Sequence, residues 1–412
     1  MRYGLLGEKL GHSFSKEIHN MLGDYSYDLI EVAKEDFDSF VASGDFDGVN
    51  VTIPYKEAII PSLKYIDDAA KAIGAVNTVV RKSDALYGYN TDFYGMVKLI
   101  NHAKVGIKGR KIAILGTGGT AKTARAVAEH LGAKEILTVS RTDKPSTITY
   151  DMLYSQHNDI EVVINTTPKG MYPNADECPL DLDKFSQLFG VIDAIYNPLR
   201  STLVVEAKKR GMRAEGGLYM LVAQAVRASE IFTGKKHDEK IIDKIYRKLI
   251  RSKENIVLIG MPASGKSTVG RILEKKLSKK LIDTDKLIEH KAKCSIPEMF
   301  RTQGEDYFRD FESNVIKEIS AKNGIIIATG GGSILRGVNV DNFKKNGRLY
   351  FIDRPLTKLI PTSNRPLASN AHDIEKRFNE RYSIYSKVAD VRIDSNTSAP
   401  ISADKIIEDY NS

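Results

Sequence analysis

The chain has 412 residues, of which 42% are hydrophobic and 28% charged, with a formal net charge of +8. This length predicts two or three domains, and no apolar stretch reaches the ~18 residues that a membrane-spanning helix requires. The densest basic cluster, "KKLSKK" at 275–280, is typical of a solvated helix end, so the charge pattern argues against a nucleic-acid-binding protein.

The predicted elements alternate strands with helices. Within residues 1–102 we expect strands at 27–32, 47–53 and 74–80. From residue 110 the alternation becomes regular, with strands at 111–115, 135–140, 161–166 and 190–196 and helices at 120–131 and 218–233. This rhythm predicts an α/β fold with a parallel sheet and crossover helices.

A glycine loop, "LGTGGTA" at 115–121, connects one of these strands to a helix. It is a shortened form of the dinucleotide fingerprint, in which glycines let the backbone approach a pyrophosphate at a helix N-terminus. A plain strand–helix turn explains the loop equally well. The next strand ends in Ser140, Arg141 and Thr142. An arginine at that point favours NADP over NAD, because it suits the extra 2′-phosphate.

The N-terminal block is rich in small polar groups. The stretches "GHSFSKEIHN" (11–20), "NVTIPYK" (50–56), "GAVNT" (74–78) and "GYNTD" (88–92) are interleaved with strands. Each could be turn chemistry alone, but together they favour a lining for a polyhydroxylated ligand. Lys56 could equally be a surface lysine and Asp92 a helix N-cap.

These stretches, followed by "GTGGTA", "SRT", "INTTPKGM", "DAIYNPLRS" and "GGLYMLVAQA", resemble shikimate dehydrogenase over about residues 1–235. The resemblance implies reduction of 3-dehydroshikimate to shikimate by NADPH. It implies Lys56 and Asp92 as the catalytic pair. The implied substrate-binding residues are Ser13, Ser15, Thr52, Asn77, Asp92, Tyr196 and Gln224. The implied cofactor-binding residues are Gly116, Gly118, Gly119, Thr120, Ser140, Arg141, Thr142, Ala194 and Gly217.

The chemistry agrees with this pair. Hydride delivery to a ketone leaves negative charge on oxygen, which a nearby cationic lysine stabilises and protonates. Two positions depart from the family pattern. Tyr219 stands where a small residue is expected, which predicts a narrower nicotinamide side of the cleft, and Ser140 replaces an asparagine.

A charged helical stretch at 235–255 leads to a second glycine loop. "GMPASGKS" at 260–267 fits the P-loop pattern G-x-x-x-x-G-K-[ST], follows the strand "NIVLIG" at 255–260 and precedes a helix-like run. Backbone N–H groups of such a loop cradle phosphates, Lys266 reaches the terminal ones, and Ser267 can coordinate Mg²⁺. We expect "LIDTD" to end a strand, which would place Asp283 and Asp285 on one face.

The loop, "LIDTD", "FRTQGEDYFRDFE", "TGGGS", "SNRPL" and "ERYSIY" together resemble shikimate kinase over about residues 254–410. The resemblance implies Asp283 and Ser267 at Mg²⁺, and Asp285 at the substrate hydroxyl as orienter or base. It places Arg309 and Arg381 at the substrate carboxylate and Gly330, Gly331 and Gly332 near the ring. The nucleotide would contact Gly260, Ala263, Ser264, Gly265, Lys266, Ser267, Thr268 and, from a mobile lid, Arg365.

The lid is shorter than this family pattern predicts. Only fourteen residues separate Tyr350 from Arg365. No adenine-contacting arginine is evident in this stretch, and Lys358 is a poor candidate for that role. Lid closure and nucleotide affinity are therefore expected to differ from the family pattern.

We therefore predict an α/β chain with four parts. They are a substrate lobe at 1–102 completed by 218–235, a Rossmann-like NADP lobe at 103–217, a helical linker at 236–253, and a P-loop kinase domain with a parallel sheet at 254–412. The expected cofactors are NADP(H), ATP and Mg²⁺, and the expected partners are small molecules. Neither nucleic acid nor membrane is expected as a partner.

The expected location is the cytoplasm. The N-terminus has no signal-peptide pattern, and Cys178 and Cys294 fall in different predicted domains, which fits a reducing compartment.

Two alternatives stay open. A quinate-type dehydrogenase could be fused to the kinase, although Arg141 argues against NAD. The C-terminal domain could instead bind nucleotide and regulate the dehydrogenase, although intact Lys266 and Asp285 argue against that.

Overall fold

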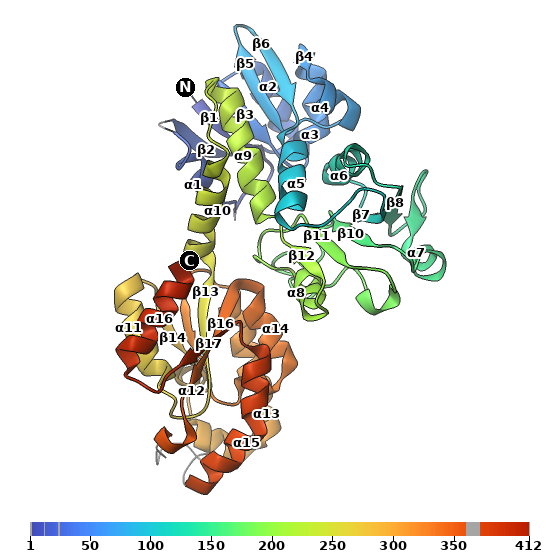
Figure 1. Cartoon of the computed structure of the whole chain (residues 1–412). Helices are drawn as coiled ribbons and strands as arrows, with labels where there is room; N and C mark the ends of the chain where they lie inside the picture. The colour runs from blue at the N-terminus through green and yellow to red at the C-terminus, as the bar shows by residue number, and fades with distance from the viewer. Residues whose placement is uncertain (1, 12, 24, 360–370, 412) are drawn as a thin grey trace. The chain divides into compact units, whose positions relative to one another are not determined.

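The computed structural model describes residues 2–11, 13–23, 25–359 and 371–411. The chain forms two compact units, Met1–Arg247 and Lys248–Ser412, and both are α/β as the sequence predicts (Figure 1). The division falls inside helix α10 (Lys240–Lys253). None of the helices in the described ranges combines the length and apolar character that crossing a bilayer demands.

The first lobe of unit Met1–Arg247 is built on a mixed sheet of order β2-β1-β3-β5-β6-β4. Its strands are β1 (Arg2–Gly7), β2 (Ser26–Glu31), β3 (Gly48–Val51), β4 (Tyr65–Ile66), β5 (Thr78–Lys82) and β6 (Ala85–Tyr89). The pairs β3–β5 and β5–β6 are antiparallel, and the other pairs are parallel. Its helices are α1 (Ser15–His19), α2 (Phe37–Ser43), α3 (Tyr55–Ala58), α4 (Asp68–Ile73), α5 (Thr91–His102) and α9 (Leu218–Thr233).

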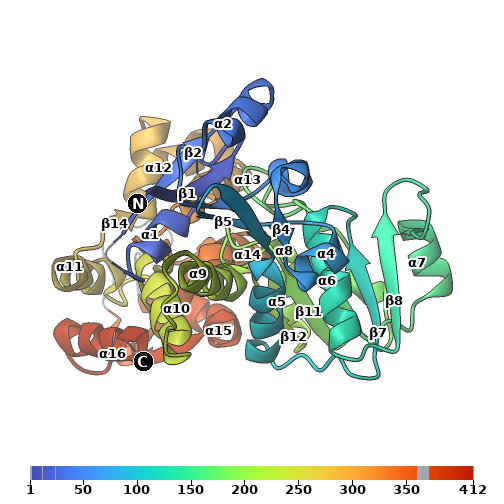
Figure 2. The same ribbon diagram turned by 90° about the horizontal axis from the view of Figure 1, so that it is seen from above.

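Helices α5 and α9 lie side by side (Figures 1 and 2). Their backbones approach closely at Gly95, where an added Cβ would lie 2.7 Å from the carbonyl oxygen of Met220. Glycine at this position therefore permits the tight packing of the two helices.

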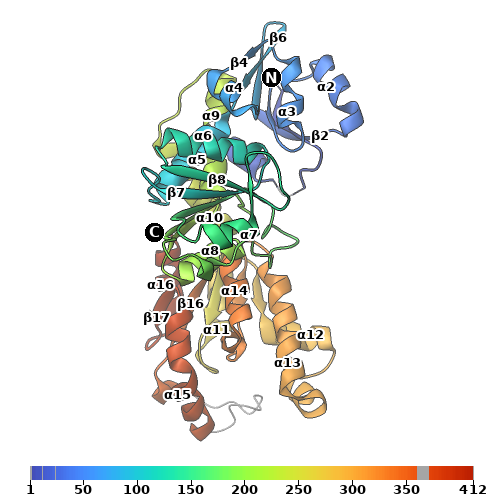
Figure 3. The same cartoon turned by 90° about the vertical axis from the view of Figure 1, so that its right-hand side faces the viewer.

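The second lobe of the same unit has an all-parallel sheet of order β12-β11-β10-β7-β8-β9. Its strands are β7 (Lys111–Leu115), β8 (Glu135–Ser140), β9 (Ile148–Thr149), β10 (Val162–Asn165), β11 (Gly190–Asp193) and β12 (Arg213–Glu215). Helix α6 (Gly119–His130) covers one face, and α7 (Tyr150–Gln156) and α8 (Thr202–Lys209) cover the other (Figure 3). Such a sheet is buried on both sides, which explains its continuous apolar strands.

Unit Lys248–Ser412 has a parallel sheet of order β14-β15-β13-β16-β17. Its strands are β13 (Asn255–Ile259), β14 (Leu281–Asp283), β15 (Ile326–Ala328), β16 (Gly347–Asp353) and β17 (Val391–Asp394). Helices α11 (Lys266–Leu277) and α16 (Ala399–Asn411) pack on one face, and α13 (Ile296–Ser320), α14 (Gly337–Asn346) and α15 (Ala371–Val388) on the other. Helix α12 (Thr284–Ala292) follows β14 directly.

Two local expectations are wrong. The predicted strand at 74–80 begins only at Thr78, because α4 ends at Ile73 and its C-cap, Gly74, is left-handed with φ of +71°. The expectation that Asp283 and Asp285 share a strand face is also wrong. Strand β14 ends at Asp283, whose side chain caps α12 by accepting from the Lys286 N–H, and Asp285 lies in the first turn of that helix. Because Asp283 caps the helix, the strand ends two residues before Asp285, where the predicted strand ended.

Candidate active sites

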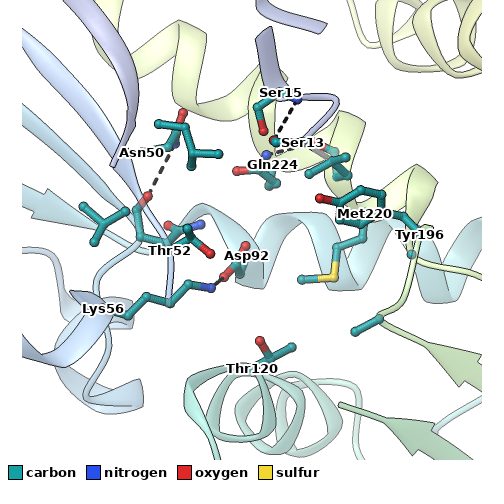
Figure 4. A pocket seen from close by; sticks show the side chains of 16 residues that line it. Ser13, Ser15, Asn50, Thr52, Lys56, Asp92, Thr120, Tyr196, Met220 and Gln224 are labelled. Carbon is teal, nitrogen blue, oxygen red and sulfur yellow. Dashed lines mark hydrogen bonds and ion pairs between the residues drawn. The ribbon is translucent and has the colours of Figure 1, made fainter. Parts of the chain in front are cut away.

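A pocket of about 160 Å³ opens between the two lobes of unit Met1–Arg247 (Figure 4). It gathers every predicted substrate residue of this unit together with three predicted cofactor residues. Its lining comprises Leu5, Ser13, Ser15, Asn50, Val51, Thr52, Lys56, Asn77, Asp92, Thr120, Ala194, Tyr196, Gly217, Met220, Leu221 and Gln224. The ends of strands and the starts of helices from distant parts of the chain therefore converge on one cavity.

An ion pair forms the centre of this pocket. The ammonium of Lys56 lies 2.5 Å from Oδ2 of Asp92, and the two side chains are 17% and 11% exposed. Lys56 stands in the short helix α3, and Asp92 in the first turn of α5. The N-cap of α5 is Asn90, which accepts from the Phe93 N–H at 3.1 Å. Because Asn90 does the capping, the Asp92 carboxylate is available to Lys56.

A buried amide and hydroxyl network holds the wall behind this pair. Oδ1 of Asn77 accepts from the Thr91 N–H at 2.6 Å, and Thr91 Oγ1 reaches Gln224 Oε1 at 3.4 Å. Asn50 also lines the pocket and donates to Thr78 Oγ1 at 3.0 Å. Sequence reasoning missed Asn50, although it begins the polar stretch "NVTIPYK" that also contains Thr52 and Lys56.

Tyr196 lines the pocket beside the Ser13–Ser15 turn. The Ser15 N–H donates to Ser13 Oγ at 3.2 Å, and the Tyr196 ring lies 5.4 Å from that of Phe14, between the two serines. Burial raises the pKa of Tyr196, so its phenol stays protonated and can donate to a bound anion.

The first glycine loop starts α6. Gly116 has φ of +110°, and Gly118 is the N-cap, where an added Cβ would meet nothing within 4 Å. Gly119 and Thr120 form the first turn of α6, where backbone N–H groups have no partner within the helix. The loop therefore fits a pyrophosphate.

A cationic group flanks this loop. Ser140 ends β8, and Arg141 and Thr142 follow it, with the Thr142 N–H donating to Ser140 Oγ at 3.4 Å. Lys144, an exposed residue of the loop after β8, donates to Thr117 Oγ1 at 3.3 Å. Two exposed cations beside a phosphate-type loop fit a further phosphate group.

Asp193 supports the turn that carries Ala194 and Tyr196. This carboxylate, at the end of β11, accepts from Ser201 Oγ at 2.5 Å, from the Ile195 N–H at 3.0 Å and from Asn165 Nδ2 at 3.0 Å. It is fully buried, and burial raises its pKa from 3.8 to about 7.

This burial predicts a pH-dependent stability. Between about pH 4 and 7 the folded chain holds a proton at Asp193 that the unfolded chain has released, so the contribution of this group falls as pH rises, by up to about 1.4 kcal/mol per pH unit. Asp193→Asn removes the titration. The free energy of unfolding is measured by urea denaturation. The difference between the variant and the native chain should therefore shift in favour of the variant as pH rises between these values, and should stay constant above pH 7. A pH-independent difference would contradict the burial argument.

The second glycine loop has the geometry of a phosphate cradle. Gly260 and Gly265 have φ of +146° and +92°, and Ala263 has φ of +64°. Nζ of Lys266 donates to the carbonyl oxygens of Gly260 and Met261, both at 2.8 Å. Oγ of Ser264 is buried with no partner among the described residues, as expected for a hydroxyl aimed at a ligand.

The loop leads into α11, where Ser267 and Thr268 form the first turn after Lys266. Oγ of Ser267 donates to Oδ2 of Asp283 at 2.6 Å. A hydroxyl and a carboxylate in contact are the oxygen ligands that Mg²⁺ prefers beside bound phosphates.

Three predicted substrate side chains converge on the glycines that follow β15. A Cβ added to Gly330 would lie 2.5 Å from Asp285 Oδ1, and one added to Gly332 would lie 2.5 Å from the Arg309 guanidinium. Nη1 of Arg381 donates to the carbonyl oxygen of Gly331 at 3.3 Å. A larger residue at Gly330 or Gly332 would displace the Asp285 carboxylate or the Arg309 guanidinium.

The two arginines of this site favour an anion. Arg309 pairs with buried Glu312 at 2.7 Å. Burial lowers the pKa of Arg381, and the nearby charges of Arg377 and Arg309 lower it further. Cations that repel each other at a buried site are stabilised by a bound carboxylate.

The lid prediction lies outside the described residues, because Arg365 falls in 360–370. The preceding segment supplies a cation that sequence reasoning missed. Arg354 follows β16, and a Cβ at Gly265 would lie 3.8 Å from its Nη1. Lys358 instead donates to the carbonyl oxygen of Asn396 at 2.7 Å.

Two family models match the chain, one in each unit. The shikimate dehydrogenase substrate-binding-domain model matches residues 5–79, and the shikimate kinase model matches residues 262–411. A shikimate dehydrogenase (NADP(+)) of Clostridium perfringens (strain 13 / Type A) is 39% identical over 266 residues, which cover 60% of this chain and 97% of that protein. The shikimate dehydrogenase (NADP(+)) of Bacillus subtilis (strain 168) is 34% identical over 258 residues, covering 57% of this chain and 92% of that protein.

Solved structures give the same result. A chorismate mutase/shikimate 5-dehydrogenase fusion protein from Clostridium acetobutylicum matches with a TM-score of 0.57 and 37% identity, covering 60% of this chain and 96% of that one. Shikimate 5-dehydrogenase from Thermus thermophilus, in complex with NADP(H) and shikimate, matches with a TM-score of 0.55 and 25% identity, covering 60% and 99%. The chain therefore belongs to the shikimate dehydrogenase family and carries a shikimate kinase domain behind its dehydrogenase part.

Proposed function

We propose that this chain is a bifunctional enzyme that reduces 3-dehydroshikimate to shikimate with NADPH and then phosphorylates shikimate with ATP and Mg²⁺. The observation that carries the proposal is the Lys56–Asp92 pair, set in a pocket of hydroxyls and amides, in the same chain as a complete P-loop. The hydroxyl that the first reaction forms is the one that the second reaction phosphorylates. We place the enzyme in the cytoplasm, where both nucleotides are available and its two free cysteines stay reduced.

In the reduction, NADPH supplies the hydride. Lys56 stabilises the negative charge that develops on the substrate oxygen and donates a proton to it, while Asp92 orients the ammonium. Ser13, Ser15 and Tyr196 bind the substrate carboxylate. Thr52, Asn77 and Gln224 hold the ring hydroxyls.

In the phosphorylation, ATP with Mg²⁺ supplies the phosphoryl group. Lys266 and the loop N–H groups hold the phosphates, and Ser267 with Asp283 would hold the metal ion. Asp285 accepts the proton of the shikimate hydroxyl. Arg309 and Arg381 bind the substrate carboxylate. The proposed role of Arg365 is to contact the nucleotide from the lid.

Arg141 is expected to set the preference for NADPH. In Arg141→Ala the KM for NADPH should rise roughly 10- to 100-fold, because charge-assisted hydrogen bonds to the 2′-phosphate are lost. The KM for NADH, which lacks that phosphate, is the internal control and should stay unchanged. Lys144→Ala should give a smaller shift in the same direction. An equal rise for both nucleotides would remove Arg141 from the 2′-phosphate site.

One assay tests the whole proposal. The purified chain is supplied with 3-dehydroshikimate, NADPH, ATP and Mg²⁺, and NADPH oxidation and phosphorylated product are followed together. NADPH consumption without phosphorylated product would support a nucleotide-binding regulatory domain instead. Clear activity on quinate with NAD, and little on shikimate with NADP, would support a quinate-type dehydrogenase.

A further inference from the structure

An aromatic cluster joins three helices within unit Met1–Arg247. His102, the last residue of α5, stacks on Tyr219 of α9 with ring centroids 3.9 Å apart and planes at 14°. Tyr246 of α10 meets both rings edge-on, at 5.2 Å from His102 and 5.1 Å from Tyr219. The Tyr219 hydroxyl donates to Oδ1 of Asp243, also on α10, at 2.7 Å. We call these four residues the α10 clamp.

The clamp joins the C-terminal end of α5, at His102, to the first turn of α9, at Tyr219, and both helices contribute residues to the pocket. Helix α5 bears Asp92 in its first turn and His102 at its end. Helix α9 contributes Met220 and Gln224 to the pocket, and Figure 4 shows both side chains directed into it. The helices touch backbone to backbone at Gly95. A change in angle between them would therefore alter the spacing of Asp92 and Met220.

Tyr219 does not line the pocket, although its neighbour Met220 does. Successive residues of a helix point about 100° apart, so Met220 faces the cavity while Tyr219 faces α10. The expectation that Tyr219 narrows the nicotinamide side of the cleft is therefore wrong. The departure from a small residue at this position instead provides an anchor for α10.

We propose that Tyr219 is a positioning residue of the dehydrogenase, which acts by binding α10 to the paired ends of α5 and α9 and so fixes the wall of the pocket formed by Met220 and Gln224. The proposal rests on the proposed reduction. It makes the first turns of α10, up to Arg247, part of the dehydrogenase rather than a solvated linker. Ile242 and Ile245 agree with this, because each is only 2% exposed.

The electrostatics of the clamp suit a fixed contact. Burial raises the pKa of Tyr219, and Asp243 raises it further, so the phenol keeps its proton and donates to the carboxylate. Burial lowers the pKa of His102, which favours the neutral ring that stacks on Tyr219. Lys98 of α5 adds an ion pair with Glu239, just before α10, at 3.1 Å.

Variants on both sides of the contact test the proposal in the full-length chain. In Tyr219→Ala the KM for 3-dehydroshikimate should rise and kcat/KM should fall roughly tenfold or more, since small displacements of a binding wall are costly. Tyr219→Phe keeps the stacked ring and should recover most of that loss. Tyr246→Ala, on α10, should reproduce the effect of Tyr219→Ala. Tyr65→Ala, at a half-exposed tyrosine away from the pocket, is the matched control and should match the native chain.

The controls separate positioning from stability. Rates are measured well below the melting temperature of each variant, and phosphorylation of added shikimate should be unchanged in all of them. A lower melting temperature in Tyr219→Ala with native KM and kcat would overturn the proposal, as would a native KM in Tyr246→Ala. If the native chain fails to reduce 3-dehydroshikimate, the proposed function falls. The clamp is then tested by NADPH binding, which is measured through the fluorescence of the nucleotide. Tyr219→Ala should weaken this binding.

Discussion

Lys56→Ala is expected to reduce NADPH-dependent turnover of 3-dehydroshikimate by about 10³-fold or more. The side chain is the cation nearest the centre of the pocket, and it contacts Asp92 at 2.5 Å in a site with little solvent. Alanine removes both the positive charge that stabilises the developing alkoxide and the proton that neutralises this alkoxide. The rate of NADPH oxidation under saturating substrate measures the loss.

Phosphorylation of added shikimate by the same variant should be unaffected, because the phosphate cradle is in the other unit. Lys64→Ala, at an exposed lysine a few residues on, is the matched control and should reduce substrate normally. Loss of both activities in a folded Lys56→Ala variant would mean that the two reactions are coupled. Near-native reduction would remove Lys56 from the chemistry.

Asp285→Asn is expected to reduce phosphorylation of shikimate by roughly 10²- to 10⁴-fold. The amide has almost the shape of the carboxylate beside Gly330, but it cannot accept a proton from the substrate hydroxyl. Because the change is nearly isosteric, the KM for ATP should change little while kcat falls. Product formation from added shikimate, ATP and Mg²⁺ measures the effect.

Asp306→Asn is the matched control, since Asp306 is an exposed aspartate of α13. Reduction of 3-dehydroshikimate should be native in both variants. Undiminished phosphorylation in Asp285→Asn would assign the role of base or orienter to another group. A native chain that phosphorylates nothing would instead favour a regulatory role for the kinase domain.

Local patterns made much of this protein predictable. Both glycine loops are short, and their chemistry depends on backbone conformations that only certain residues adopt. The segments at 115–121 and 260–267 therefore identified their strand–loop–helix contexts without any tertiary information. The apolar strands of the two parallel sheets were equally predictable from the sequence, because such strands are buried on both faces.

Element ends were harder, because side-chain caps compete with strand and helix patterns. Asn90, rather than Asp92, caps α5, and Asp283 caps α12 and ends β14. In each of these two segments, several neighbouring side chains can accept a hydrogen bond from a backbone N–H group. The sequence alone does not show which of them caps the helix and which points into the site.

What the sequence by itself determined is the α/β class, the two phosphate loops and the families that their motifs indicate. The tertiary structure alone decided which distant side chains meet. It brought Asp285, Arg309 and Arg381 to three glycines. It also turned Tyr219 away from the pocket and onto α10. The physical reason is that backbone preferences act over a few residues, whereas these contacts join segments far apart in the chain and depend on how whole helices pack.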